Sequence, residues 1–129
     1  MRARRRAESG ASVVEFVLVM TVLVPLVLGI VQVGLVLHVR NTLTAAASDG
    51  ARAGAPLGAT PEQAAERTRS SIRAALDDRY AGDVTATATQ VGDVEVVAVR
   101  VRTEVPALGL MGPAVPLDVR GRAVREQDP

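Results

Sequence analysis

The 129-residue sequence contains no cysteine, no tryptophan and no lysine, and Phe16 and Tyr80 are its only aromatic residues. Without cysteine, disulfide bonds, thiolate metal sites and cysteine nucleophiles are excluded. A core built almost entirely from Val, Ala and Leu packs thinly, so we expect any folded domain to be marginally stable or supported by a partner. The net charge of +1 argues against binding nucleic acid through bulk charge.

Signatures of catalysis are also missing. The sequence has no P-loop, dinucleotide-binding glycine pattern, HExxH motif or nucleophile elbow. His38 is the only imidazole, and Ser48 and Asp49 follow it on what reads as the same helix, so no second element lines a pocket. Asp77 and Asp78 could suggest a paired-carboxylate site. Adjacent side chains on a helix point about 100° apart, so we interpret the two as a solvated helix end. We therefore expect no enzymatic activity, no cofactor, no metal and no small-molecule substrate.

A long uncharged run extends from Phe16 to Leu37. As a helix it would span roughly 33 Å, enough to cross a bilayer core. Four arginines precede it: Arg2, Arg4, Arg5 and Arg6. By the positive-inside rule this charge places the N-terminus in the cytoplasm and the remainder outside. The sequence thus predicts a single-pass protein of the cytoplasmic (inner) membrane.

One acid, Glu15, lies at the edge of this run, five residues after Gly10. A carboxylate at membrane depth costs on the order of 2.5–3.5 kcal/mol unless it finds a partner. Cleavage after Gly10 on the cytoplasmic side would give Ala11 a free ammonium group as that partner. The pair could form within one chain or with a neighbouring subunit, and the second arrangement would fix the register between packed helices.

Gly10, four residues, Glu15 and Phe16 before a long apolar helix resemble the prepilin cleavage motif of the type IV pilin superfamily. More narrowly, residues 9–54 resemble the TadE-like pseudopilins of tight-adherence (Flp) pilus systems. Matching blocks are Arg-Asn-Thr-Leu-Thr-Ala-Ala-Ala over 40–47 and Asp-Gly-Ala-Arg-Ala over 49–53. Ala11 stands where many type IV pilins have Phe, and Phe16 replaces the Tyr typical of major Flp pilins, which favours a minor pseudopilin.

The resemblance implies cleavage between Gly10 and Ala11 by a prepilin peptidase, with Glu15 and Phe16 serving assembly and register. The partners implied are the membrane, other pilins or pseudopilins and the pilus assembly platform, with incorporation in a pilus or secretion filament. One alternative is an unprocessed single-span protein whose head binds a partner or the cell wall, which leaves Glu15 without a reason. Another is a secreted domain released at an Ala-x-Ala site, Ala45–Ala47.

Other features of the N-terminal helix concern its shape and packing. Pro25 frees a backbone carbonyl and predicts a kink, and Gln32 could hydrogen-bond a neighbour. Asp49 and Arg52 are spaced to pair along the helix. Beyond the apolar run, helical spacing gives one narrow face suited to close packing against another helix or the head: Leu43, Ala46, Ala47, Gly50 and Gly54.

The rest of the chain reads as a small α+β head. A Gly- and Pro-containing break over 54–59 precedes a capping box at Thr60 and Gln63, with Pro61 at the first helical position. The helix should end near Tyr80, and its buried face should comprise Ala65, Thr68, Ile72, Ala75 and Leu76. Strands are predicted over 84–90, 94–105 and 117–124, forming a three-stranded antiparallel meander beside the helix.

Two features of the predicted sheet remain open. The loop over 106–116 has an apolar tip, Leu108, Leu110 and Met111, which either contacts another pseudopilin or folds under the sheet. The exposed face carries Arg100, Arg102, Arg120 and Arg122, interpreted as a solvated face partly paired with Glu104 and Asp118 rather than a site for an acidic partner or phosphate. The predicted organisation is a basic leader over 1–10, a transmembrane and assembly helix over 11–54, and an extracytoplasmic head over 55–129.

Overall fold

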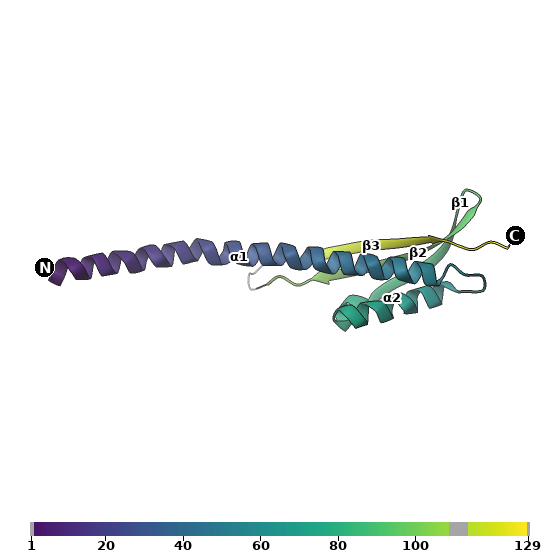
Figure 1. Cartoon of the computed structure of the whole chain (residues 1–129), viewed down its shortest axis with the longest axis horizontal. Helices are drawn as coiled ribbons and strands as arrows, with labels where there is room; N and C mark the ends of the chain where they lie inside the picture. The colour runs from purple at the N-terminus through teal and green to yellow at the C-terminus, as the bar shows by residue number, and fades with distance from the viewer. Residues whose placement is uncertain (1, 109–113, 129) are drawn as a thin grey trace.

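The computed structural model describes residues 2–108 and 114–128. One long helix runs beside a small head along its C-terminal half (Figure 1). In chain order the elements are α1 (Arg2–Ala53), α2 (Pro61–Ala75), the 3-10 helix η1 (Asp78–Ala81), β1 (Asp83–Val91), β2 (Val94–Val105) and β3 (Val115–Val124). The predicted α+β fold is confirmed.

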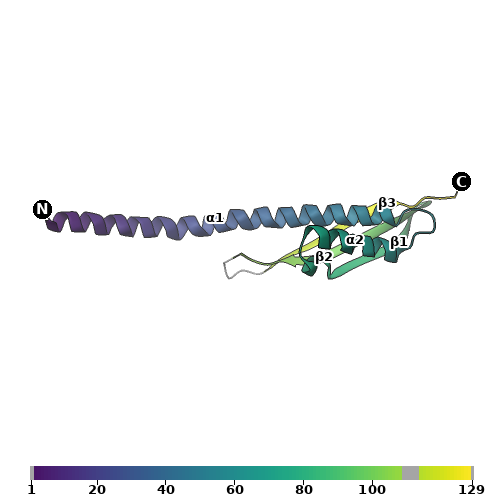
Figure 2. The ribbon, with the colours of Figure 1, turned by 60° about the horizontal axis from the view of Figure 1, so that its bottom comes forward.

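Helix α1 is unbroken from the basic leader through the apolar run into the head. It continues through Pro25, and Figures 1 and 2 show a gently curved rod there. The kink expected at Pro25 stays a prediction. The same helix therefore forms the apolar segment and one side of the head.

Helix α2 begins as the sequence predicts. The Gln63 amide donates to Thr60 Oγ1 at 3.3 Å, and the Thr60 amide donates to Gln63 Oε1 at 3.0 Å. This reciprocal pair satisfies two of the amide groups that a helix start leaves free. Pro61 occupies the first turn, where its missing N–H costs nothing.

The end of α2 was predicted wrongly, because the helix stops at Ala75 and Tyr80 lies in η1. Asp77 has an extended backbone, and its side chain accepts from the Arg79 amide at 3.1 Å, which starts the 3-10 turn. That local bond competes with continued helix. The buried face also differs: Ala75 is exposed, Leu76 is half-buried, and the buried residues are Ala64, Ala65, Thr68 and Ile72.

The three strands form one antiparallel sheet in the order β1-β2-β3. Strand β2 has the predicted bounds, and a two-residue turn joins it to β1, with Gly92 at a positive φ of 63° that suits glycine. Strand β3 begins at Val115, so the loop predicted over 106–116 is shorter than expected. Of its predicted apolar tip, Leu110 and Met111 lie outside the described residues.

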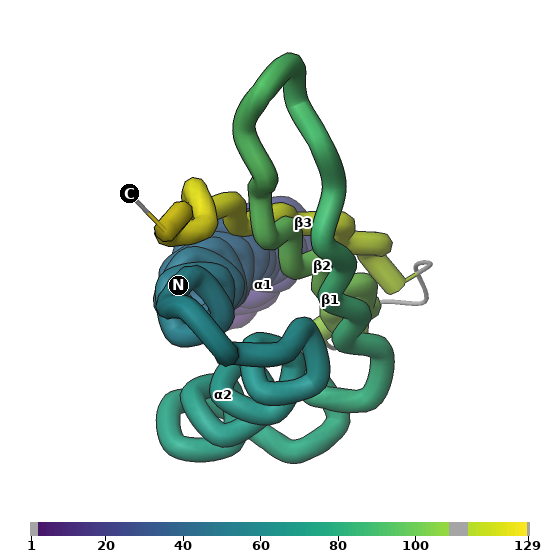
Figure 3. Tube along the Cα trace, turned by 90° about the vertical axis from the view of Figure 1, so that its right-hand side faces the viewer, coloured from purple at the N-terminus to yellow at the C-terminus, as the bar shows by residue number. Residues whose placement is uncertain are grey.

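Both helices lie on one face of the sheet, α1 against β2 and β3 and α2 against β1 (Figure 3). Alternate β2 residues, Val97, Val99, Val101 and Val105, are buried between the layers. From α1, Val39 and Leu43 complete this core. The turn of the β1–β2 hairpin projects beyond it (Figure 3), and Val91 is 58% exposed there.

Candidate functional site

The part of α1 from Val13 to Val33 is largely apolar and exposed. Between Val13 and Val33 large apolar side chains cover every side of the helix, with Phe16 62%, Val22 71% and Ile30 64% exposed. The helix is long and apolar enough to cross a membrane. An exposed apolar surface of this extent outside the head is typical of a single-pass membrane protein.

The predicted cleavage and register residues lie on this segment. Gly10 and Ala11 are helical and exposed, and a Cβ at Gly10 would meet no atom within 4 Å. Glu15 and Phe16 are exposed on the next turn. Within the described part of the chain, Glu15 forms no hydrogen bond or ion pair through its side chain, so its carboxylate is available to a group outside this protomer.

The small-residue face of α1 is occupied by the chain's own head. All five of its residues, Leu43, Ala46, Ala47, Gly50 and Gly54, are buried. A Cβ at Gly50 would collide with Thr68 Oγ1 and approach the Ala64 carbonyl oxygen at 2.7 Å, and one at Gly54 would lie 2.8 Å from Ala64 Cβ. The glycines thus allow α2 to approach α1 closely.

Gly121 on β3 makes the second close approach. A Cβ there would lie far inside van der Waals distance of the Ala47 carbonyl and the Ser48 amide. These are backbone atoms of α1, which no side-chain rotation moves aside. The sequence pattern placed Gly121 in a strand and gave no signal of this contact, because the contact joins two elements distant in sequence.

Asp49 does not pair with Arg52 as predicted from their spacing. Its carboxylate instead lies 3.0 Å from Arg67 Nε on α2 and accepts from Ser71 Oγ at 3.2 Å. Helix α2 places these two donors across the interface from Asp49, whereas Arg52 shares its helix. The acid therefore ties α1 to α2.

Gln32, within the apolar run, binds the chain that follows β2. Its Nε2 donates to the Pro106 carbonyl at 3.2 Å, and its Oε1 accepts from the Leu108 amide at 2.9 Å. We call these two hydrogen bonds the Gln32 clasp. The sequence suggested a hydrogen bond from Gln32 but could not name its partner.

Part of the charge on the exposed sheet face is paired between its own side chains. Arg100 Nε donates to Asp118 Oδ1 at 2.8 Å and a second nitrogen binds Oδ2, while Arg102 lies 4.0 Å from the same carboxylate. The hydrogen bond from Arg100 lowers the pKa of Asp118 and raises the pKa of Arg100. Glu104, also expected to pair, forms no ion pair among the residues described.

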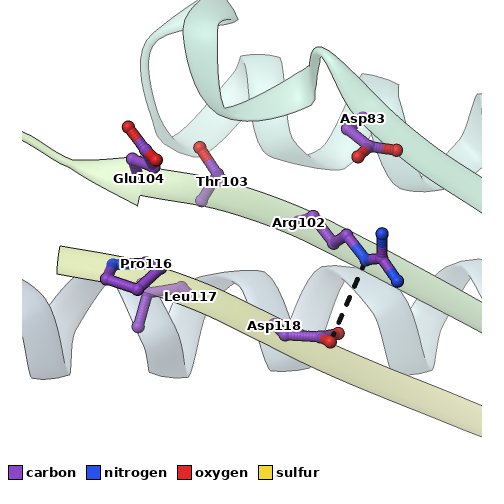
Figure 4. A pocket seen from close by; sticks show the side chains of 7 residues that line it. All are labelled: Asp83, Arg102, Thr103, Glu104, Pro116, Leu117 and Asp118. Atoms are coloured by element: carbon purple, nitrogen blue, oxygen red, sulfur yellow. Dashed lines mark ion pairs between the residues drawn. The ribbon is translucent and has the colours of Figure 1, made fainter. Parts of the chain in front are cut away.

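A shallow pocket lies on this face, lined by Asp83, Arg102, Thr103, Glu104, Pro116, Leu117 and Asp118 (Figure 4). The Arg102–Asp118 pair crosses it from β2 to β3, and both basic and acidic groups border it. Such mixed lining gives no preference for an anion. Over residues 2–108 and 114–128, no three His, Asp or Glu side chains gather to hold a metal ion.

Comparison with known protein families finds a match over about a third of the chain. Residues 10–52 match the family model described as TadE-like protein. The match confirms the resemblance read from the sequence, and it begins at Gly10 and ends inside the last turn of α1. No curated protein and no solved structure matches the chain. Together with the apolar helix, the match fits a membrane protein related to the tight-adherence pilus.

Proposed function

We propose that this protein is a minor pseudopilin of a tight-adherence (Flp-type) pilus or a related secretion assembly. The observation that carries the proposal is the exposed apolar half of α1, with Glu15 at its edge, inside a segment that matches TadE-like proteins. In this role the helix resides in the membrane before assembly and packs among other pilin helices afterwards. The chain has no catalytic task.

Processing supplies the missing partner of Glu15. A prepilin peptidase cuts after Gly10, and Ala11 becomes a terminal ammonium group. Ala11 and Glu15 are four residues apart on a helix, which places their side chains on the same face about 5–6 Å apart. In an assembled helix bundle, the Glu15 carboxylate binds the ammonium of a neighbouring subunit and sets the axial register.

The exposure of both positions supports this arrangement. Neither Ala11 nor Glu15 is covered by the head, which packs only against the C-terminal half of α1. A register contact with another subunit needs this accessibility. The N-terminus lies in the cytoplasm and the head outside, as the four leading arginines favour.

The alternative of a secreted domain released after Ala47 would remove part of the core of the head. Val39, Leu43, Ala46 and Ala47 would leave with the anchor, although all four are buried in the core of the head. The head of a released domain would expose the apolar surface that they cover. The other alternative, an unprocessed single-span protein, keeps this core. Determining the mature N-terminus distinguishes that alternative from the pseudopilin.

The deciding measurement is the intact mass of the protein purified from its native host. A chain beginning at Ala11 supports the proposal, and a chain beginning at Met1 contradicts it. Gly10→Val serves as the matched variant, since the structure leaves open space around Gly10 and the helix tolerates Val. This variant should keep the leader while the wild type loses it; equal processing of both would contradict the cut site.

A further inference from the structure

We propose that the end of β2 and the residues after it, Pro106–Leu108, insert into the head-side leaflet of the membrane, held there by the Gln32 clasp. The partner of this surface is the lipid acyl chain. The proposal rests on the membrane span of α1 and on none of the processing or assembly steps proposed above.

The depth of Gln32 follows from the two ends of the apolar run. The run from Phe16 to Leu37 is about as long as the hydrocarbon core is thick. Gln32 lies five residues inside Leu37, which is about 8 Å of helix. Sliding α1 so that Gln32 reached the interface would bury Glu15 by a further turn, at the cost of an ionised carboxylate in hydrocarbon.

The head also reaches down to this level. Leu35 and Val36, both inside the apolar run, are partly buried against its core, and Val39 is fully buried. The C-terminal end of β2 points toward the N-terminal half of α1 (Figure 2). Hydrogen bonds from Gln32 to Pro106 and Leu108 then place these loop residues at the depth of Gln32 itself.

The clasp meets part of the condition that hydrocarbon imposes on irregular backbone. Backbone N–H and C=O groups outside helices and sheets have no water to bind there, so each needs a partner in the protein. Gln32 supplies a partner for one group of each kind, because it donates to the Pro106 carbonyl and accepts from the Leu108 amide. Its own amide, costly in an apolar helix, is satisfied by the same two bonds.

The side chains of the segment suit this position. Pro106, Ala107 and Leu108 are apolar and half-buried, so part of their surface remains for lipid. Arg40, three residues beyond Leu37, is exposed at the level expected for phosphate head groups. Apolar residues therefore lie below the boundary and a cation lies at it.

The test uses the absence of tryptophan from the chain. Leu108→Trp in the full-length protein gives a single fluorescent reporter, reconstituted into phosphatidylcholine vesicles with brominated acyl chains. Leu57→Trp is the control, because Leu57 is 57% exposed in the loop between α1 and α2, at the opposite end of the head. The Leu108→Trp protein should lose most of its tryptophan emission to bromine, and the Leu57→Trp protein should keep nearly all of it.

Gln32→Leu in the Leu108→Trp background tests the clasp. Leucine suits the apolar helix but leaves the two loop backbone groups without partners, so quenching should fall toward that of the control. Resistance of the head to limited trypsin digestion in detergent reports whether each variant is folded. Equal quenching of the Leu108→Trp and Leu57→Trp proteins, both folded, would overturn insertion, and unchanged quenching on loss of Gln32 would overturn the role of the clasp.

Discussion

Gly121→Ala adds one methyl group at the point where β3 touches the backbone of α1. The new Cβ would overlap the carbonyl of Ala47 and the amide of Ser48, so either the strand or the helix must move. Inserting atoms into a well-packed core costs typically 1–3 kcal/mol, and a clash with rigid backbone belongs at the upper end, about 3 kcal/mol. The head of roughly 75 residues is expected to have a free energy of unfolding of about 4–11 kcal/mol.

A loss of about 3 kcal/mol in a domain of this size lowers the Tm by about 12–24 °C. The assay is thermal unfolding of the full chain in detergent, followed by the near-ultraviolet dichroism of Tyr80, because the signal of the membrane helix does not interfere there. Gly82→Ala is the matched control: Gly82 has a φ of −72°, which alanine adopts freely, and its added Cβ would meet its nearest atom at 3.6 Å. That variant should be neutral or slightly more stable.

Equal stability of the two variants would refute the close approach of β3 to α1. If Gly121→Ala unfolds at the same temperature as Gly82→Ala, the strand and the helix backbone are farther apart than described. A second substitution, Ala47→Gly, should not rescue Gly121→Ala, because the atoms that clash belong to the backbone. Rescue by Ala47→Gly would show that the side chain of Ala47 causes the strain.

Three further predictions concern other sites. Glu15→Ala should insert in the membrane but fail to support filament assembly, whereas Glu8→Ala, in the leader, should assemble normally; normal filaments from the first variant would contradict the register role. Gly50→Ala should destabilise the head by about 1–3 kcal/mol in a denaturation experiment. Adding Thr68→Ala to this variant should restore part of the lost stability, because the Thr68 hydroxyl is the atom nearest to the added Cβ. A double variant no more stable than Gly50→Ala would argue against this contact. The pKa of Asp118 is lowered in the folded state, so the unfolded chain binds a proton at this carboxylate more readily. The ionised Asp118 therefore adds stability that is complete above about pH 4 to 5 and is lost as the pH falls below that range. Asp118→Asn should therefore flatten the acid limb of a stability-against-pH curve, and an unchanged slope would be inconsistent with the pairing.

Local patterns were enough to predict most of the elements. The alternation of Val with polar residues fixed β2 to its observed bounds, and the capping box fixed the start of α2. The end of α2 was missed because Ala74 to Tyr80 is compatible with helix, and helical spacing gives no sign of the extended Leu76 or of the Asp77 side-chain bond that starts η1. A one-turn error at that end also misassigned Ala75 to the buried face.

Contacts between distant segments could not be predicted in this way. The two bonds of the Gln32 clasp join residues 74 and 76 positions apart, and nothing near Gln32 indicates the loop that binds it. Asp49 had a plausible partner on its own helix, and tertiary packing supplied a different one, Arg67. Sequence spacing records neighbours along an element and carries no information on which element lies opposite.

The candidate site likewise has a local part that the sequence could predict and a part that depends on other molecules. Gly10 and Glu15 form a short motif within one helix, so the sequence locates them directly, and the family match begins at the first of them. Their proposed roles involve a peptidase and a second subunit, and these remain predictions because a single chain contains neither partner.

The continuity of α1 has a mechanical consequence. The helix that crosses the membrane is also the spine on which the sheet and α2 are mounted, without a linker between the two. An axial pull or a rotation applied to its membrane segment therefore moves the head by the same distance or angle. When such a subunit is drawn from the bilayer, its head should turn and rise together with the helix. The orientation of the head about the helix axis then follows that of the membrane segment.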